Sequence, residues 1–204
     1  MNEARRKERT MRGRMSLKPR IVFGLAMIAS VLLAACGEAT ERPTTQPAAN
    51  LTSTRGISDP ELRRVREEAN RILDGGPAAF AQRLEELRGS PVVVNQWASW
   101  CGPCRFEFPF FERQAVKYGD RVAFLGVNSR DSRSEAEEFL GELPTPFPHY
   151  FDPEAEIART FKGGRAWPTT AFYDADGKLV FTHTGAYRDE QQLEDEIRRY
   201  ALDA

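Results

Sequence analysis

The hydrophobic positions of the chain fall into short runs whose spacing alternates between that of strands and that of helices. Apolar and β-branched runs predict strands at residues 92–97, 122–127, 149–151, 169–173 and 179–184. Helical spacing predicts helices at residues 58–73, 80–87, 101–118, 134–140, 154–161 and 189–200. Strands that alternate with helices favour an α/β fold, with a central mixed sheet covered by helices on both faces.

Two details of this pattern make specific predictions. Ser58 stands three residues ahead of Glu61, which is the spacing of a capping box, and Pro60 fits the first turn. The apolar stripe continues as far as Leu73, so the first helix is expected to span residues 58–73. Pro109 lies inside the helix at residues 101–118 and should kink it, because proline removes a backbone donor.

The first 35 residues have the pattern of an export signal. Residues 1–20 carry eight Arg or Lys and two Glu, and they lead into an apolar run at 21–35. That run is shorter than the roughly 20 residues that a spanning helix needs. Leu33-Ala34-Ala35-Cys36 resembles the lipobox of bacterial lipoproteins, which implies a lipid anchor on Cys36. An ordinary signal peptide with an incidental cysteine, or an uncleaved anchor, is the alternative.

The chain is therefore divided into a signal peptide at 1–35, a lipidated cysteine with a disordered tether at 36–56, and one domain at 57–204. The 204 residues leave room for a single ordinary core, and the formal net charge of -1 gives no reason to expect a nucleic-acid partner. Of three cysteines, lipidation of one leaves a pair. Outside the cytoplasm such a pair meets oxidised partners.

The pair lies in Trp97-Ala-Ser-Trp-Cys101-Gly-Pro-Cys104, after a predicted strand and at the start of a predicted helix. A helix N-terminus stabilises a thiolate, so Cys101 is the expected nucleophile. Cys104 follows one turn later and can resolve a mixed disulfide, while Gly102 and Pro103 allow a tight entry into the helix. A structural disulfide, a zinc site with His149 and His183, and coincidence are the alternatives.

The string Trp100-Cys101-Gly102-Pro103-Cys104 resembles the active site of the thioredoxin superfamily. The resemblance covers residues 87–204 and implies that Pro168 is a cis-proline beside the cysteines, where it grips substrate together with Thr169. Trp100 and Trp167 are candidates to line a peptide groove, with burial in the core as the alternative. The two histidines are interpreted as structural.

Two departures from cytosolic thioredoxins narrow the resemblance to the TlpA/ResA-like, membrane-tethered branch. Asn95 stands where those proteins have a buried Asp, and Glu107 lies three residues beyond Cys104. In that branch such a glutamate assists proton transfer, and positions i and i+3 share a helix face. A solvated glutamate is the alternative. Residues 129–161 also look like the central insertion of that branch.

The sequence predicts an extracytoplasmic thiol–disulfide oxidoreductase that needs no cofactor beyond its cysteine pair. The Gly-Pro dipeptide matches that of thioredoxin, whose potential is about −270 mV, which favours a reductant. The resemblance implies exported protein disulfides as substrates, with apocytochrome c as the usual client of that branch, a thiol–disulfide electron donor in the membrane, and a monomer. Rivals are a disulfide oxidase or isomerase, a peroxidase of the peroxiredoxin group, and a redox-inactive binding module.

Overall fold

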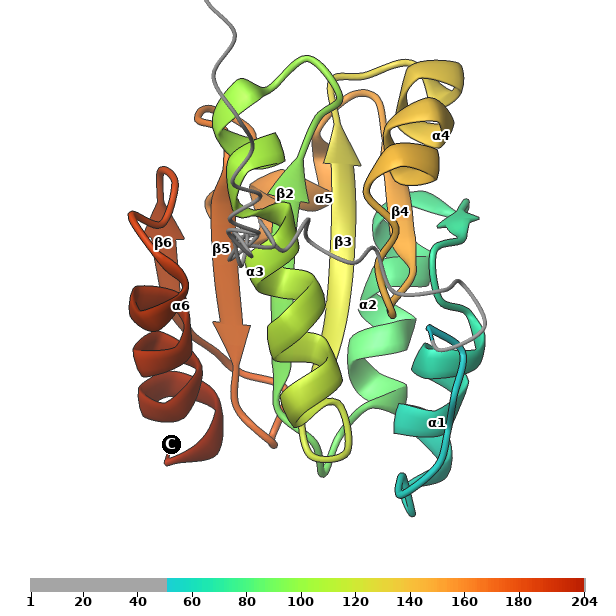
Figure 1. Cartoon of the computed structure of the whole chain (residues 1–204), viewed down its shortest axis with the longest axis vertical. Coiled ribbons are helices and arrows are strands. Elements are labelled where there is room, and N and C mark those ends of the chain that lie inside the picture. Colours follow the sequence, from blue (N-terminus) through green and yellow to red (C-terminus); the bar gives the residue numbers. More distant parts are fainter. Residues whose placement is uncertain (1–50, 204) are drawn as a thin grey trace, which may run out of the picture. The chain divides into compact units, whose positions relative to one another are not determined.

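The computed structural model describes residues 51–203 (Figure 1). The predicted signal peptide and Cys36 lie outside the described residues. Leu51 already has a buried side chain, ahead of the predicted domain start at residue 57, and Ile57 belongs to the main core. Within residues 51–203, no helix is both long and apolar enough to cross a membrane.

A six-stranded mixed sheet forms the centre of the described domain, in the order β1-β4-β3-β2-β5-β6. The first four strands of that order run parallel, and β5 and β6 are antiparallel to their neighbours. All residues of β2, β3 and β5 are buried, as expected for strands covered on both faces. The strands are β1 (Ile72–Leu73), β2 (Val92–Trp97), β3 (Ala123–Ser129), β4 (His149–Asp152), β5 (Thr169–Tyr173) and β6 (Leu179–Thr184).

Helices cover both faces of this sheet, which confirms the predicted fold class. In Figure 1, α3 and α6 lie in front of the sheet, and α5 lies behind it. Phe139 of α4 packs on Trp97 and Phe108, so α4 shares the face of α3. The helices are α1 (Pro60–Glu67), α2 (Gly76–Glu86), α3 (Gly102–Tyr118), α4 (Arg133–Glu142), α5 (Glu156–Thr160) and α6 (Glu190–Ile197), which a π-helical turn at Arg198–Leu202 extends. Pro109 lies within α3, which is one continuous helix in the structure.

The first helix differs from the prediction at both ends. Its N-cap is Asp59 and not Ser58, because the Asp59 carboxylate accepts from the backbone N–H groups of Glu61 and Leu62. It ends at Glu67, and the chain turns at Asn70, whose φ is 60°. Ile72 and Leu73 then pair with β4 as an edge strand. Ile72 and Leu73, which the apolar stripe assigned to the helix, therefore pair with a neighbouring strand and do not extend α1.

The α1 helix also supports the helix that carries the cysteines. Arg66 is buried, and its guanidinium donates to the carbonyl oxygen of Ala115 at the C-terminal end of α3 (2.7 Å). A cation at this end of a helix is favoured by the helix dipole. Gly119 makes the contact possible, because a β-carbon at this position would overlap the Arg66 guanidinium.

Candidate functional site

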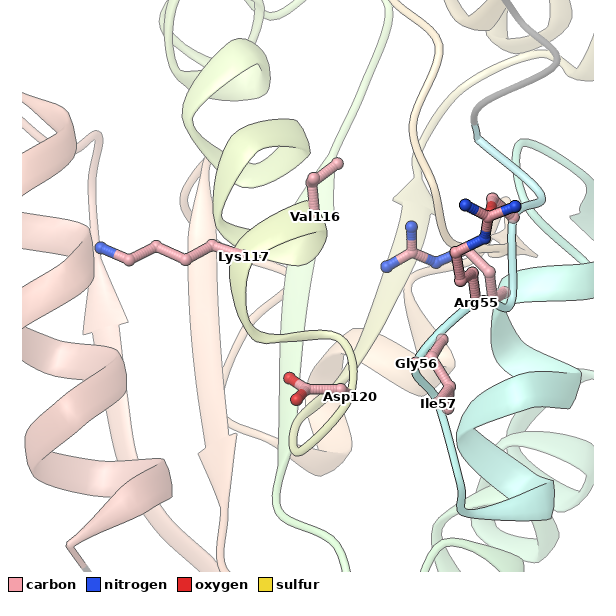
Figure 2. A pocket seen from close by; sticks show the side chains of 8 residues that line it. Arg55, Gly56, Ile57, Val116, Lys117 and Asp120 are labelled. Atoms are coloured by element: carbon pink, nitrogen blue, oxygen red, sulfur yellow. The ribbon is translucent and has the colours of Figure 1, made fainter.

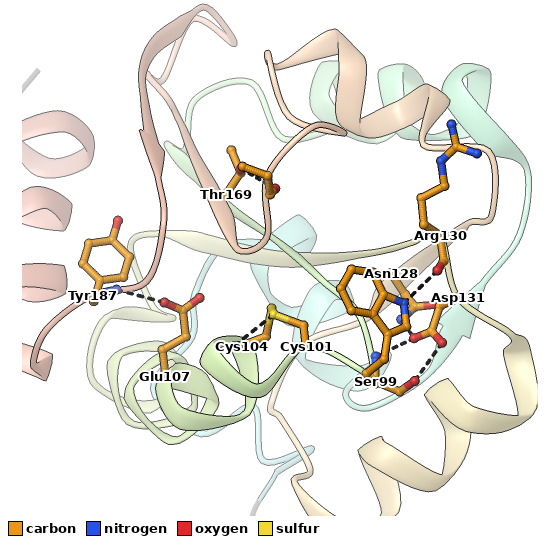
Figure 3. The surroundings of a disulfide bond; sticks show 11 residues. Ser99, Cys101, Cys104, Glu107, Asn128, Arg130, Asp131, Thr169 and Tyr187 are labelled. Atoms are coloured by element: carbon orange, nitrogen blue, oxygen red, sulfur yellow. Dashed lines mark hydrogen bonds between the residues drawn. A yellow bond between two sulfur atoms is a disulfide. The ribbon is translucent and has the colours of Figure 1, made fainter.

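The cysteine pair lies where β2 ends and α3 begins (Figure 3). Cys101 is the N-cap of α3, and its sulfur accepts a hydrogen bond from the Cys104 backbone N–H (3.1 Å). The two sulfurs form a disulfide, with 5.3 Å between the Cα atoms. Cys101 keeps 3% of its surface exposed, whereas Cys104 is fully buried. Cys101 is therefore the sulfur that a partner can reach, and Gly102 and Pro103 are exposed beside it.

Two tryptophans from distant parts of the chain meet beside the disulfide. The rings of Trp100 and Trp167 lie 5.3 Å apart, and Trp100 is 57% exposed. The Trp167–Pro168 peptide bond is cis, and the buried Thr169 donates its hydroxyl hydrogen to the Ala166 carbonyl (3.0 Å). The structure thus brings the predicted site residues at 100–104 and 167–169 together.

Glu107 is buried on the α3 turn that follows Cys104. Its side chain has no exposed surface, so the alternative of a solvated glutamate is wrong. One carboxyl oxygen accepts from the Tyr187 backbone N–H (3.1 Å), and the other has no hydrogen-bond partner among the described residues. Burial raises the pKa of Glu107 from 4.5 to about 8, and the Tyr187 hydrogen bond only partly opposes this. Glu107 therefore holds a proton at neutral pH in the disulfide form.

Asp131, which the sequence analysis did not identify, fixes the approach to Cys101. Its carboxylate accepts from the Ser99 backbone N–H (2.6 Å), the Ser99 hydroxyl (2.7 Å) and the Asn128 amide (2.7 Å). Next to it, the Arg130 carbonyl accepts from the Trp100 indole (2.8 Å). The carboxyl ends of parallel strands meet at one sheet edge, so an acidic residue two positions after the end of β3 was a usable signal.

His149, interpreted as structural, lies in a closed network on the same sheet face. The Trp97 indole N–H donates to His149 Nδ1 (3.0 Å), so Nε2 carries the ring hydrogen. Nε2 lies 2.7 Å from the Thr145 hydroxyl, which in turn donates to the Phe147 carbonyl (3.0 Å). Burial lowers the pKa of His149 from 6.5 to about 3. Its two ring nitrogens are thereby engaged with the protein, which leaves none for a zinc ion.

A pocket of about 470 Å³ lies at the other end of α3, and it does not include the cysteines (Figure 2). A helix of 17 residues is about 25 Å long, so this pocket is far from the disulfide. Lys117 points away from the other labelled lining residues, because its ammonium binds Glu194 (2.8 Å). Residues 51–203 contain no group of three His, Cys, Asp or Glu placed to hold a metal ion.

Comparison with known proteins identifies relatives that are thiol-disulfide oxidoreductases. Residues 77–197 match the Redoxin family. The thiol-disulfide oxidoreductase ResA of Halalkalibacterium halodurans is 28% identical over 140 residues, which cover 68% of this chain and 78% of ResA.

Two solved structures agree with this match. A Chlorobium tepidum protein described as a thiol:disulfide interchange protein, DsbE, matches with a TM-score of 0.53 and 32% identity, over 57% of this chain and 84% of its own. The exposed lipoprotein thioredoxin Etrx1 of Streptococcus pneumoniae matches with a TM-score of 0.50 and 28% identity, over 57% and 89%.

Proposed function

The chain belongs to the Redoxin family and is a thiol–disulfide oxidoreductase, and we propose that it works outside the cytoplasm as a lipid-anchored reductant of exported proteins. Family membership excludes the redox-inactive binding module considered above. The predicted lipobox at Cys36 supports the anchor. One structural relative of this protein, Etrx1, is itself called an exposed lipoprotein. Cysteine pairs of apocytochrome c are the proposed client class, on the resemblance to the TlpA/ResA-like branch.

In the proposed reaction, the reduced protein transfers two electrons to a client disulfide. The Cys101 thiolate attacks one client sulfur, forms a mixed disulfide and releases the other client sulfur as a thiolate. Cys104 then loses its proton and attacks Cys101, which restores the protein disulfide and frees the second client thiol. A thiol–disulfide donor in the membrane would reduce the pair again.

Glu107 carries the proton in this scheme. The protonated Glu107 can give its proton to the departing client thiolate, and the carboxylate that remains can then accept the proton of Cys104. The single observation that supports this role is the complete burial of its carboxyl group one turn beyond Cys104, with one oxygen unpaired. A carboxyl group that the fold keeps protonated near neutral pH is suited to give and take a proton.

The surface around Cys101 is suited to bind an extended client chain. Trp100 and Trp167 offer aromatic area on one side of Cys101, and Pro168 and Thr169 lie beside them. Gly102 and Pro103 present no long side chain over the cysteine, so a client backbone can approach closely. We assign client binding to these six residues.

The reduction potential of the Cys101–Cys104 pair tests the proposed direction of electron flow. It would be measured on residues 37–204 by equilibration with glutathione or dithiothreitol, with a Cys104→Ser variant as the control that cannot form the pair. A reductant should lie near −270 mV, whereas a value near −120 mV would make this a disulfide-forming enzyme and contradict the proposal. Reduction of a client disulfide should also be lost in Cys101→Ser.

A further inference from the structure

A row of residues crosses the sheet at one level beneath α3. Its members are paired across neighbouring strands: His149 with Gly126, Gly126 with Asn95, Asn95 with Thr170, and Thr170 with His183. Directly paired residues point to the same face of a sheet. Trp97 packs on Phe108 of α3, and Asn95 lies two residues earlier in the same strand, so this is the face that α3 covers.

The middle of this row contains polar atoms that the protein leaves unpaired. Both polar atoms of the Asn95 amide, the Thr170 hydroxyl oxygen and Glu107 Oε1 are buried and have no hydrogen-bond partner among residues 51–203. An unpaired buried polar group is unfavourable, so such atoms are normally bridged by a bound water. Asn95 and Thr170 are paired on the face that α3 covers, and Glu107 is a buried residue of α3, so these three side chains form one polar site.

From this site a chain of hydrogen bonds leads outward. Tyr187 is 1% exposed, and its backbone N–H donates to Glu107 Oε2 (3.1 Å). The Tyr187 hydroxyl donates to Glu196 Oε2 (2.8 Å), and Glu196 Oε1 lies 3.0 Å from His183 Nδ1. The His183 ring stacks on Tyr187, and its side chain is 15% exposed. A buried hydroxyl is thus joined through a carboxylate to an imidazole that reaches solvent.

We propose that Tyr187, Glu196 and His183 form an outlet through which the Glu107 carboxyl proton exchanges with solvent. The outlet depends on the proton-carrying role proposed above for Glu107. As a proton leaves Glu107, the Tyr187 hydroxyl receives one proton and gives another. Glu196 takes the proton that Tyr187 releases and passes it to His183 Nδ1 in the imidazole tautomer that carries its hydrogen on Nε2, and Nε2 then gives that hydrogen to water. One proton leaves Glu107 as one enters solvent, and no electron moves.

The other charged groups nearby are engaged elsewhere. On α6, Glu190 binds Arg113 and Gln114, and Glu194 binds Lys117, Tyr118 and Arg198. The loop before α6 contributes Tyr187, β6 contributes His183, and α3 contributes Glu107 itself. Glu196 is therefore the carboxylate on α6 through which a proton can pass between the tyrosine hydroxyl and the imidazole. The outlet residues Tyr187, Glu196 and His183 are positioning residues for Glu107, since they touch neither the cysteines nor a client.

The test measures how fast Glu107 loses its proton. Oxidised full-length protein in detergent is jumped from about pH 6 to about pH 10, and stopped-flow infrared follows the protonated carboxyl band that Glu107→Gln lacks. Tyr187→Phe and Glu196→Gln should each slow its disappearance by at least about tenfold. Tyr173→Phe is the matched control, because it removes another buried phenol hydroxyl on the opposite face of β5 and should leave the rate unchanged.

Wild-type rates in both outlet variants would contradict the outlet, as would equal slowing in the Tyr173→Phe control. A third variant, His183→Ala, adds a readout that a purely structural role would not move: added imidazole should restore its rate. If Tyr187→Phe does not fold, Glu196→Gln and His183→Ala decide the question. The assay contains no client, so it is independent of the proposed reductant role, and absence of the Glu107 band would instead contradict the protonation of Glu107.

Discussion

His149 and Glu107 are both ionisable and both buried on the α3 face of the sheet, and the protein satisfies their hydrogen bonds to different degrees. His149 uses both ring nitrogens within the fold, toward Trp97 and Thr145. Glu107 uses one oxygen, toward the Tyr187 backbone, and leaves the other unpaired beside two more unpaired side chains. Burial favours the neutral form of each group, and so it lowers the pKa of the histidine and raises that of the glutamate.

The difference shows how a structural buried group can be told from a functional one. A closed network holds Trp97 in place and has no spare hydrogen-bonding capacity, so nothing needs to enter or leave it. An open site beside a disulfide keeps a proton that can move when the cysteines react. The two sites differ in the completeness of their hydrogen bonding and in their access to the sulfurs, and not in depth of burial.

The largest expected effect is on stability as a function of pH. The His149 pKa is about 3 in the fold against 6.5 unfolded, so its contribution is present above pH 6.5 and is lost as the pH falls toward 3. The Glu107 pKa is about 8 against 4.5, so its contribution is present below pH 4.5 and is lost as the pH rises toward 8. Each loss could reach about 5 kcal/mol. The two ranges overlap between pH 4.5 and 6.5, where the opposing slopes cancel, so urea unfolding of the oxidised protein should show its greatest stability there.

Glu107→Gln separates the two limbs of that curve. The amide has no charge to bury, so the decline in stability between pH 6.5 and 8 should disappear, while the acidic limb due to His149 should remain. A variant whose stability still falls between these values would show that another group causes the alkaline limb. One urea denaturation series across pH measures both the acidic and the alkaline limb of the stability curve.

The next effect concerns the glycine that makes room for His149. A β-carbon at Gly126 would overlap the imidazole, so Gly126→Ala should displace the ring and break its hydrogen bond with Trp97. We expect a loss of about 3 kcal/mol in the free energy of unfolding. Gly141→Ala is the control, because a β-carbon there meets no atom, and it should change stability by less than about 1 kcal/mol. Equal effects would mean that His149 is loosely held.

The smallest effect comes from one substitution made in both sites. Thr145→Val removes the hydroxyl that serves His149, and it should reduce stability by about 1–2 kcal/mol. Thr170→Val removes a hydroxyl that has no protein partner, and it should change stability by less than about 0.5 kcal/mol. Thermal unfolding of both variants gives the comparison, and a larger loss for Thr170→Val would reverse the assignment of the two sites.

The fold was predictable because its main strands are short β-branched runs with clear turns on either side. The predictions at 92–97, 122–127 and 169–173 coincide with β2, β3 and β5 to within two residues. The first helix was predicted too long, because helical spacing cannot show that Ile72 and Leu73 gain backbone partners in β4. That pairing depends on a strand almost eighty residues away, which no local pattern contains.

The site was predictable where its residues are adjacent in sequence or belong to a known motif. Cys101, Cys104 and Glu107 follow from one string, and the Trp167–Pro168 bond follows from the resemblance. Asp131 and Tyr187 were missed, because each acts through the fold: one accepts from the Ser99 backbone and the other donates its own backbone N–H to Glu107. The sequence also could not show that Phe106 is 58% exposed while Phe108 and Phe111 are buried.

Titration of the Glu107 carboxyl group tests the central claim most directly. The oxidised protein would be labelled with ¹³C at glutamate side-chain carboxyls, and Glu107→Gln would identify the resonance. No cysteine titrates in this form, so the midpoint belongs to Glu107 and its surroundings. The account predicts a midpoint near pH 8. A midpoint near 4.5, the value of an ordinary exposed glutamate, would contradict it.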